Sequence, residues 1–394
     1  MVKSILLVSP DSRQGTYTNP PSGLLYLHAM LRAHDIQVVW RDENQGDVVD
    51  VPHDITGISM MTSNRHRALE LAKQAKDAGR TVIVGGPHPT LMWEHLLRNY
   101  PFIDACVIGD GEYPMLEIAQ GKRFEYVAGV AFRSGREIVH TTPVPPRLDT
   151  LPFPSFDTVD FSRYVGGARV FFSRGCAWGK CMFCSVAATW GAQRWRSPGN
   201  MINEMLWLRS LGQEGFALYD DCLTGNRELI VGLLNGMIDN NLNTMWWCGT
   251  TRVGMVDREL IGLIKRAGCQ ELTFGVETAH PEAMKVYAKG QTVEQAEQAI
   301  AWCKEVGLCT SVLMIYNGLR AREFDPVSHA WVARMKVGEG SANELQIFPG
   351  TPLYKAMVDN GFMDDHFWLG PEPFGIYRGQ LDHLSPQDWA KYHG

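Results

Sequence analysis

The chain has 394 residues, of which 45% are hydrophobic and 20% charged, a composition typical of soluble globular proteins and a length that suits two domains. Its formal net charge of -6, without a clustered basic face, argues against nucleic acid as a partner. The longest apolar runs have the length of a strand, and the first residues lack the apolar core and cleavage site of a signal peptide. We therefore expect a cytoplasmic protein, away from membranes, whose nine cysteines are reduced.

The first 125 residues alternate short apolar segments with amphipathic ones. We predict strands over residues 4–9, 36–42, 55–61, 81–86 and 104–112, and helices over residues 22–34, 66–78 and 90–98. Apolar strands that alternate with helices indicate a doubly wound, Rossmann-like parallel sheet covered on both faces. Such sheets bind ligands beyond the carboxyl ends of their strands.

Small and polar residues follow several of these strands, at positions 9–10, 59–64, 85–88 and 109–112. Residues of this kind let a ligand approach the backbone and offer free N–H groups to it. Ordinary turns favour the same residue types. Composition alone leaves a ligand site and simple turns as equal alternatives.

Residues 126–165 are predicted to link two domains, with a hairpin over 129–143 and a proline-rich run after it. A second domain is expected over 166–360, followed by a short C-terminal segment at 361–394. Its strands are predicted over residues 168–175, 215–221, 244–251, 271–277, 309–318 and 342–350, and its helices over 199–211, 227–240, 257–266, 293–306 and about 326–337. Six β/α repeats indicate a partial, TIM-like (β/α)6 barrel with its site at the strand carboxyl ends.

Three cysteines stand close together at the end of the first strand of the second domain. Cys176, Cys181 and Cys184 follow one another with four and two residues between them. A loop of this length can turn three thiolates toward one soft metal centre, whereas a helix could not point all three inward. Three protein ligands leave one coordination position open, which catalysis needs.

Structural zinc is the alternative occupant of this loop. Zinc requires a fourth ligand, but His140 precedes the loop by 36 residues. The five later cysteines are scattered singly in apolar segments, where we expect them to pack in the core. The spacing therefore favours an iron–sulfur cluster.

From the cysteine loop onward, the sequence resembles radical S-adenosylmethionine (radical SAM) enzymes, in particular the branch with an N-terminal cobalamin-binding domain. Besides the loop, the likeness includes RWRSPGNMINEM, LYDDCLTGN, GCQELTFGVET, KGQT and FPGTPLY in the same order. The turns at residues 85–88 and 109–112 match the cobalamin-binding domain. The resemblance spans about residues 3–360 and implies a cobalamin-binding domain at 1–125 and a radical SAM partial barrel at 166–360.

The resemblance implies roles for named residues. Cys176, Cys181 and Cys184 ligate a [4Fe-4S] cluster, whose open iron binds S-adenosylmethionine and yields a 5'-deoxyadenosyl radical. The residues expected to contact S-adenosylmethionine are Phe183 beside the adenine, Asp220 and Asp221 near the methionine amino group, Arg252, and Glu277 near the ribose or amino group. The residues expected to contact cobalamin are Ser59, Met61, Thr62, Ser63, Asn64, Gly85, Gly86, Pro87, Gly109, Gly111 and Glu112. For the acidic residues, capping of the helices that follow is the alternative.

Two features depart from the family pattern. The first two cysteines are separated by four residues instead of the usual three, an insertion that a bulge at Gly179 can absorb. After the fifth strand, the usual Gly-Leu-Pro-Gly-Glu-Thr is replaced by NGLRARE at residues 317–323. Adenine contacts are therefore not carried over to this turn.

The loop after the first strand lacks the histidine that some cobalamin proteins place below the cobalt, since no histidine precedes His28. Histidine ligation from this loop is therefore excluded. The residues that could cover the lower face are Thr62, Ser63, Asn64 and Arg65. A cobalt without a lower ligand favours the nucleophilic cobalt(I) state.

These features predict a cobalamin-dependent radical SAM methyltransferase that acts on a carbon of a small-molecule secondary metabolite. Rearrangement, ring contraction or oxidative cyclisation with the same cofactors is one alternative, and a non-catalytic cobalamin-binding or redox-sensing protein is another. The enzyme needs an external low-potential electron donor, flavodoxin- or ferredoxin-like. Because the chain ends 40 residues after Tyr354, we expect a partner subunit, a carrier-borne substrate or the segment around Phe367, Trp368 and Tyr377 to close the barrel.

Overall fold

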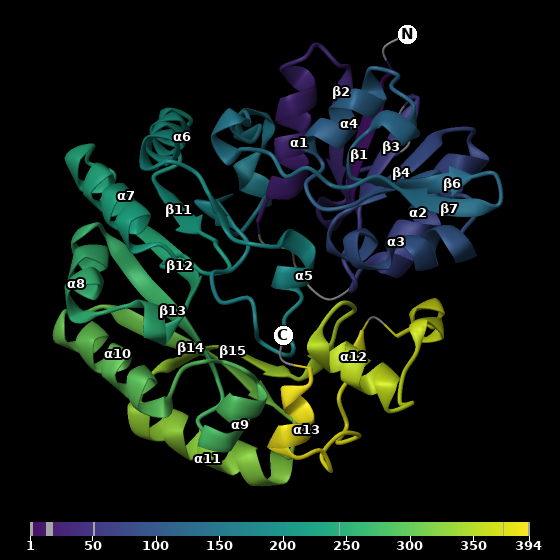
Figure 1. Ribbon diagram of the computed structural model, residues 1–394. Coiled ribbons are helices and arrows are strands. Elements are labelled where there is room, and N and C mark those ends of the chain that lie inside the picture. Colours follow the sequence, from purple (N-terminus) through teal and green to yellow (C-terminus); the bar gives the residue numbers. More distant parts are fainter. Residues whose placement is uncertain (1–2, 13–18, 50–51, 244, 373, 393–394) are drawn as a thin grey trace. The chain divides into compact units, whose positions relative to one another are not determined.

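The computed structural model describes residues 3–12, 19–49, 52–243, 245–372 and 374–392. Their internal contacts divide them into two units, which can be followed along the coloured chain in Figure 1. The first unit comprises Met1–Gly167 and Trp368–Pro373, and the second comprises Ala168–Phe367 and Phe374–Gly394. Within the described ranges, no helix is both long and apolar enough to cross a membrane.

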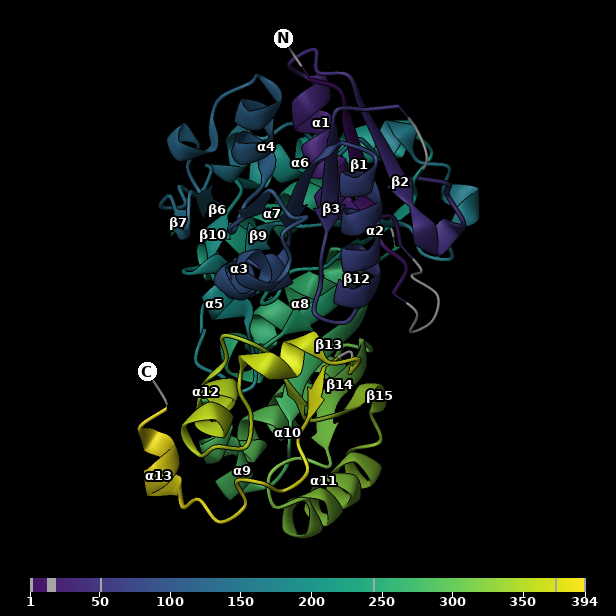
Figure 2. The same cartoon turned by 90° about the vertical axis from the view of Figure 1, so that its right-hand side faces the viewer.

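The first unit is a doubly wound α/β domain around a seven-stranded sheet with the order β2-β1-β3-β4-β5-β6-β7. Its strands are β1 (Ile5–Ser9), β2 (Val38–Asp42), β3 (Ile55–Ser59), β4 (Thr81–Gly85), β5 (Ala105–Val107), β6 (Val130–Ser134) and β7 (Glu137–His140). Its helices are α1 (Ser22–Arg32), α2 (Arg65–Asp77), α3 (Pro87–Asn99) and α4 (Glu112–Ala119). The first five strands are parallel, and Figures 1 and 2 show α1 and α4 on one face of the sheet and α2 and α3 on the other. The predicted Rossmann-like sheet is therefore confirmed.

The hairpin predicted within the linker belongs to this sheet. β6 pairs antiparallel with β5, and β7 pairs antiparallel with β6. Strand β6 is apolar and buries Val130, Ala131 and Phe132. This burial explains why the strand joins the sheet beside β5 and is not part of a linker between the two domains. The proline-rich run after the hairpin contains only short 3-10 turns.

The second unit contains six parallel strands in the order β15-β14-β13-β12-β11-β8, which confirms the predicted partial barrel. These strands are β8 (Ala168–Val170), β11 (Gly215–Leu218), β12 (Met245–Thr251), β13 (Cys269–Glu277), β14 (Cys309–Tyr316) and β15 (Gly338–Glu344). Helices lie along the outer face of the curved sheet in Figure 1, namely α6 (Pro198–Ser210), α7 (Arg227–Asp239), α8 (Arg258–Arg266), α10 (Val293–Glu305) and α11 (Ala321–Met335). The shorter elements are β9 (Ser173–Arg174), α5 (Val186–Trp190), β10 (Arg194–Trp195), α9 (Pro281–Val286), β16 (Gln346–Ile347), α12 (Pro352–Asp359), β17 (Gly375–Ile376) and α13 (Pro386–Ala390).

The second unit differs from the prediction in three elements. The last strand, expected over residues 342–350, is β15 at Gly338–Glu344, because Gln346 and Ile347 leave this sheet and pair with β17 as the separate strand β16. The strand expected over residues 168–175 stops at Val170, because the backbone turns to donate hydrogen bonds from Phe172 and Ser173 to Asp220. Helix α11 begins five residues before the predicted start, and Pro326 lies inside it. Proline favours the first turn of a helix, so its position made the helix look shorter than it is.

The predicted C-terminal segment, residues 361–394, is divided between the two units. The stretch that begins at Trp368 packs with the first unit. By contrast, β17 pairs antiparallel with β16 in the second unit. The segment is therefore part of the folded structure of both units.

Candidate active site

The cysteine loop runs from the end of β9 to α5. Its additional residue is absorbed at the predicted position, since Gly179 has a φ of 64°, a conformation that is costly for other residues. Trp178 anchors the same turn, because its indole N–H donates a 2.7 Å hydrogen bond to the carbonyl oxygen of Ala288. The N–H of Cys184 donates to the carbonyl oxygen of Cys181 over 3.1 Å. The loop is thus closed on itself and held by the segment after α9.

Two buried cations lie beside this loop. Arg252 places Nη1 3.9 Å from Sγ of Cys181, and its guanidinium lies 4.7 Å from the ring centre of Trp178. Lys289 is 4% exposed and pairs with Glu277, with 3.3 Å between Nζ and Oε1. Burial raises the pKa of the Cys181 thiol, and the charges of Lys289 and Arg252 oppose this rise. Positive charge beside the thiols suits an anionic iron–sulfur centre.

Cys222 is a fourth cysteine at the loop. Its side chain is fully buried, as expected, but its thiol also hydrogen-bonds Cys176. This bond, together with N–H groups of the loop backbone, lowers the pKa of Cys176 to about 5, whereas burial raises the pKa of Cys184 to about 12. Cys309, also expected in the core, is exposed at the start of β14. Cysteine spacing alone could not predict these two environments.

The chemistry of this loop fits a [4Fe-4S] cluster. Its three cysteines are free, half-buried thiols on one short stretch of chain, and two cations lie beside them. Among the described residues, no three His, Cys, Asp or Glu side chains stand in an arrangement that holds a metal ion. The individual ligand roles of Cys176, Cys181 and Cys184 therefore remain a prediction from spacing and surroundings.

The two aspartates after β11 have different surroundings. Asp220 is buried and accepts backbone hydrogen bonds of 3.1 Å from Phe172 and 2.5 Å from Ser173, so it holds the start of the cysteine loop. Burial raises the pKa of Asp220 to about 6. Asp221 is exposed, yet partial desolvation by the surrounding loops and the charge of Asp220 raise its pKa to about 7. Neither caps helix α7, whose N-terminus is capped by Asn226.

Glu277 and Phe183 are both neighbours of Lys289. Glu277 ends β13 with a φ of 69°, a left-handed conformation uncommon for glutamate and typical of functional sites. Phe183 lies 5.8 Å from Nζ of Lys289 and meets Tyr287 edge-on, with 5.7 Å between ring centres. The structure thus brings Phe183, Arg252 and Glu277 to the cysteine loop. Lys289 and Tyr287 were not predicted as site residues, although the KGQT match at 289–292 pointed to this stretch.

The predicted cobalamin residues gather at one edge of the first sheet. Ser59 pairs in register with Gly85, and the N–H of Met60 donates a 2.7 Å hydrogen bond to the carbonyl oxygen of Gly85. The N–H of Gly109 donates to Oγ1 of Thr90 over 3.0 Å. The loops after β3, β4 and β5 therefore adjoin, as expected for parallel strands.

Two glycines shape this edge. Gly86 has a φ of 107°, and an added Cβ would lie 2.9 Å from the carbonyl oxygen of Met60, so this glycine lets the loops after β3 and β4 pack closely. Gly109 has a φ of 77°, and no atom lies within 4 Å of the position of a Cβ. Open space beside the backbone fits the close approach of a large ligand such as cobalamin. Gly111 and the buried Glu112 stand at the N-terminus of α4.

The turn after β3 is partly occupied by its own hydrogen bonds. Oδ1 of Asn64 accepts a 2.8 Å bond from the N–H of Met61. Oγ1 of Thr62 lies 3.2 Å from Nδ1 of His88, whose pKa is lowered to about 3 by burial, so this histidine is neutral. Met61, which is 40% exposed, and the half-buried Ser63 are the more accessible side chains of the turn.

Arg65, a candidate for the lower face of the cobalt, is engaged inside the first unit. It is 1% exposed and donates hydrogen bonds to the carbonyl oxygens of Thr62, Trp368 and Gly370 over 3.1, 3.3 and 3.1 Å. Burial lowers its pKa to about 10. The ring of Trp368 meets His88 at 5.9 Å. Arg65 therefore ties the Trp368 stretch to the loop after β3.

Comparison with known protein families matches each unit separately. The B12 binding domain model matches residues 14–119, and the Radical SAM superfamily model matches residues 170–328. The first range covers the strands whose ends form the glycine-lined edge, and the second covers the cysteine loop and most of the barrel. The two cofactor-binding regions inferred from the residues thus coincide with two known domains.

Relatives and solved structures agree with this division. An uncharacterized methyltransferase of Pyrococcus horikoshii is 28% identical over 397 aligned positions, which cover 93% of this chain and 86% of the relative. An anaerobic magnesium-protoporphyrin IX monomethyl ester cyclase of Rubrivivax gelatinosus is 28% identical over 75% of this chain, which spans 58% of that protein. The fold also resembles that of the radical S-adenosylmethionine methyltransferase TsrM from Kitasatospora setae, with a TM-score of 0.79 and 18% identity over 99% of this chain and 84% of TsrM. The chain belongs to the radical SAM enzymes with an N-terminal cobalamin-binding domain, whose cofactors are a [4Fe-4S] cluster, S-adenosylmethionine and cobalamin.

Proposed function

We propose that this enzyme transfers a methyl group from S-adenosylmethionine to a carbon atom of a small molecule. The observation that carries the proposal is the presence, in one chain, of a three-thiol loop flanked by Arg252 and Lys289 and of a sheet edge whose backbone is open at Gly109. The Pyrococcus horikoshii relative and TsrM are both methyltransferases by name, which supports methyl transfer over other outcomes.

When bound, the cluster and S-adenosylmethionine supply a 5'-deoxyadenosyl radical, and cobalamin supplies a methyl carrier. The residues of this chain hold, orient and shield these groups. Cys176, Cys181 and Cys184 hold the iron, and the charges of Arg252 and Lys289 offset the negative charge of the thiolates. The three thiols leave one iron position for S-adenosylmethionine.

Three side chains around the loop are proposed to orient S-adenosylmethionine. Phe183 offers its ring face to the adenine. Asp221 binds the methionine ammonium, because it is the exposed aspartate of the pair while Asp220 is occupied by backbone N–H groups. Glu277, fixed by its ion pair with Lys289, accepts hydrogen bonds from the ribose hydroxyls or the amino group.

The cobalt is proposed to have no protein nitrogen below it. The sequence places no histidine in the loop after β1, of which residues 13–18 lie outside the described residues. In the turn after β3, the accessible side chains are Met61 and Ser63, and neither carries nitrogen. An electron paramagnetic resonance spectrum of the cobalt(II) enzyme without nitrogen splitting is expected, and resolved splitting from a protein nitrogen would contradict this part of the proposal.

Cyclisation or rearrangement of the substrate is the second candidate function. The cyclase of Rubrivivax gelatinosus matches 75% of this chain at the same identity as the methyltransferase relative, and a shared fold and cofactor set do not fix the reaction. Product mass distinguishes the two functions, since methylation adds one carbon and two hydrogens. Either reaction needs an external low-potential electron donor, flavodoxin- or ferredoxin-like, and a partner subunit or carrier-borne substrate stays a proposal for closing the barrel.

The proposed function can be tested before the substrate is known. The full chain is reconstituted anaerobically with iron, sulfide and cobalamin and incubated with a low-potential reductant and methyl-labelled S-adenosylmethionine. We expect labelled methylcobalamin and 5'-deoxyadenosine. Cys184→Ala, prepared in the same way, should abolish the 5'-deoxyadenosine because it removes a cluster ligand. Unlabelled cobalamin from the unchanged chain would count against methyl transfer.

A further inference from the structure

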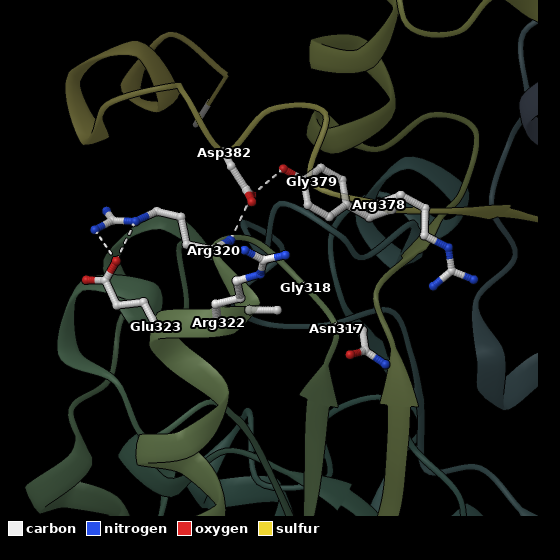
Figure 3. Close-up of a pocket in the computed structure, with 10 residues that line it drawn as sticks. Asn317, Gly318, Arg320, Arg322, Glu323, Arg378, Gly379 and Asp382 are labelled. Atoms are coloured by element: carbon white, nitrogen blue, oxygen red, sulfur yellow. Dashed lines mark hydrogen bonds and ion pairs between the residues drawn. The ribbon is translucent and has the colours of Figure 1, made fainter.

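We propose that a cavity beside the carboxyl end of β14 binds an oxyanion, the phosphate or carboxylate group of the substrate. The cavity has a volume of about 530 Å³ and lies within the second unit (Figure 3). Its lining consists of Asn317, Gly318, Arg320, Ala321, Arg322, Glu323, Tyr377, Arg378, Gly379 and Asp382. This inference rests on the proposed function, since it names the kind of substrate that the methyltransferase takes.

The charged side chains that line the cavity are three arginines and two carboxylates. Two further carboxylates outside the lining, Glu282 and Glu344, pair with Arg320 and Arg378. Arg320 is neutralised by Glu282 and Glu323, at 2.6 and 2.5 Å between the closest nitrogen and oxygen atoms. Arg322 is exposed, and it takes part in no ion pair or hydrogen bond among the described residues. Arg322 is therefore the guanidinium that is free to meet an anion, a ligand whose geometry it matches.

The opposite wall is fixed, so that the cavity keeps its shape. Oδ1 of Asp382 accepts hydrogen bonds of 2.8 Å from both the N–H of Arg320 and the hydroxyl of Tyr377. Figure 3 shows the side chain of Arg320 turned toward Glu323, while Arg322 extends toward Asp382 and Gly379. Because the carboxylate of Asp382 is already engaged by these donors, it opposes an incoming anion less than a free carboxylate would.

A second guanidinium stands at the edge of the cavity. Nη1 of Arg378 lies 2.9 Å from Oε1 of Glu344, and Nδ2 of Asn317 lies 3.2 Å from the same oxygen. Arg378 is the more exposed partner, with 57% of its side chain accessible. The ion pair with Glu344 therefore holds the guanidinium of Arg378, which would turn toward a bound anion if Glu344 did not bind it. The backbone at the start of α11, where Arg322 lies, adds the positive end of a helix dipole.

The cavity adjoins the S-adenosylmethionine side of the barrel through one residue. A Cβ added at Gly318 would overlap the hydroxyl of Tyr287, so the cavity wall and this tyrosine are in contact. Tyr287 in turn meets Phe183, the residue next to Cys184, at 5.7 Å between ring centres. A substrate held here by its anionic end thus lies on the side of the barrel where the radical forms.

Two parts of the sequence to which no cofactor contact was assigned line this cavity. Residues 317–323 depart from the usual Gly-Leu-Pro-Gly-Glu-Thr, and the departure introduces both Arg320 and Arg322. Residues 377–382 lie outside the two matched family regions. Substrate specificity is expected in parts of the chain that the cofactors do not require, because the same fold and cofactors serve many reactions.

The inference is tested by isothermal titration of the reconstituted full-length enzyme at constant ionic strength, with inorganic pyrophosphate and, separately, with citrate. Saturable binding of pyrophosphate indicates that the cavity binds a phosphate group of the substrate. Saturable binding of citrate indicates that it binds a carboxylate group. Arg322→Gln should weaken binding on the order of tenfold, the loss of about one charge-assisted hydrogen bond. Arg334→Gln, on the same helix but paired with Glu297 and outside the cavity, should leave it unchanged.

A variant with the opposite effect keeps the test independent of folding defects. Glu344→Gln releases Arg378 and should tighten binding of the same probe several-fold. The inference is overturned if neither probe binds, if Arg322→Gln binds as well as the unchanged chain, or if saturating S-adenosylmethionine displaces the probe, since the cavity would then belong to the cofactor site. Methyl labelling of cobalamin, measured on the same preparations, reports separately on the proposed function.

Discussion

Gly290 lies under the indole ring of Trp178, and its replacement tests how the cysteine loop is held. Gly290 has a φ of 58°, and a Cβ at this position would overlap that ring. Gly290→Ala must therefore displace Trp178. It removes the hydrogen bond to Ala288, worth about 1 kcal/mol, and the contact with the Arg252 guanidinium, worth ~0.5–1 kcal/mol. The left-handed backbone adds about 1 kcal/mol, so we expect the unfolding free energy to fall by about 3 kcal/mol.

Gly307→Ala is the matched control for this variant. Gly307 has a similar φ of 65°, but no atom lies within 4 Å of its Cβ position. The control therefore carries only the backbone cost of about 1 kcal/mol, and the two variants should differ by about 2 kcal/mol. Urea denaturation followed by circular dichroism measures this difference, and iron content after reconstitution measures loop closure. Equal stability and equal iron in the two variants would refute the role given to Trp178.

Three further predictions concern buried groups. Because burial lowers the pKa of His88 to about 3, the unfolded chain binds one more proton than the folded chain between about pH 3 and 6.5. The unfolding free energy should therefore rise with pH in this range by ~1.4 kcal/mol per pH unit. Urea denaturation at several pH values should show this rise in the unchanged chain and its loss in His88→Gln. In the metal-free chain, Cys222→Ala should raise the pKa of Cys176 from about 5, because it removes the thiol that hydrogen-bonds Cys176. Less thiolate is then present near pH 6, so mass spectrometry should find slower alkylation of Cys176. An unchanged alkylation rate would contradict the thiol–thiol hydrogen bond. Lys289→Met should cost about 3 kcal/mol in urea because it leaves Glu277 without its cation, and the added change Glu277→Gln should recover most of that loss.

Much of the fold could be predicted from the sequence because hydrophobic periodicity is a local signal. The strands and helices of both sheets follow apolar runs and amphipathic stretches, and their alternation determines parallel topology. The exceptions have identifiable causes. The hairpin of residues 129–143 looks like part of a linker until its pairing with β5 is known. The strand from Ala168 ends early because Asp220, 47 residues beyond Ser173, draws its backbone into a turn.

The candidate site was less predictable, because its environment depends on contacts between distant residues. The spacing of the cysteines and the family motifs identified the loop, and the bulge at Gly179 could be expected from the additional residue. The burial of Lys289 beside Glu277 and the hydrogen bond from Cys222 to Cys176 depend on how the β/α repeats come together. The KGQT match pointed to the stretch around Lys289, but the sequence does not show which side chains Lys289 and Cys222 contact. Likewise, Arg65 stands directly after the polar turn at residues 59–64, as a ligand residue would, but its guanidinium donates a hydrogen bond to the carbonyl oxygen of Trp368.

The central claim is that three thiols hold an iron–sulfur cluster with one iron free for S-adenosylmethionine. Mössbauer and electron paramagnetic resonance spectra of the anaerobically reconstituted chain, recorded before and after addition of S-adenosylmethionine, test it most directly. We predict about four irons and four sulfides per chain, a reduced cluster whose spectrum changes when S-adenosylmethionine binds, and loss of both in the variant with Cys176, Cys181 and Cys184 replaced by alanine. Stoichiometric zinc without sulfide, or a cluster spectrum that S-adenosylmethionine leaves unaltered, would contradict the account.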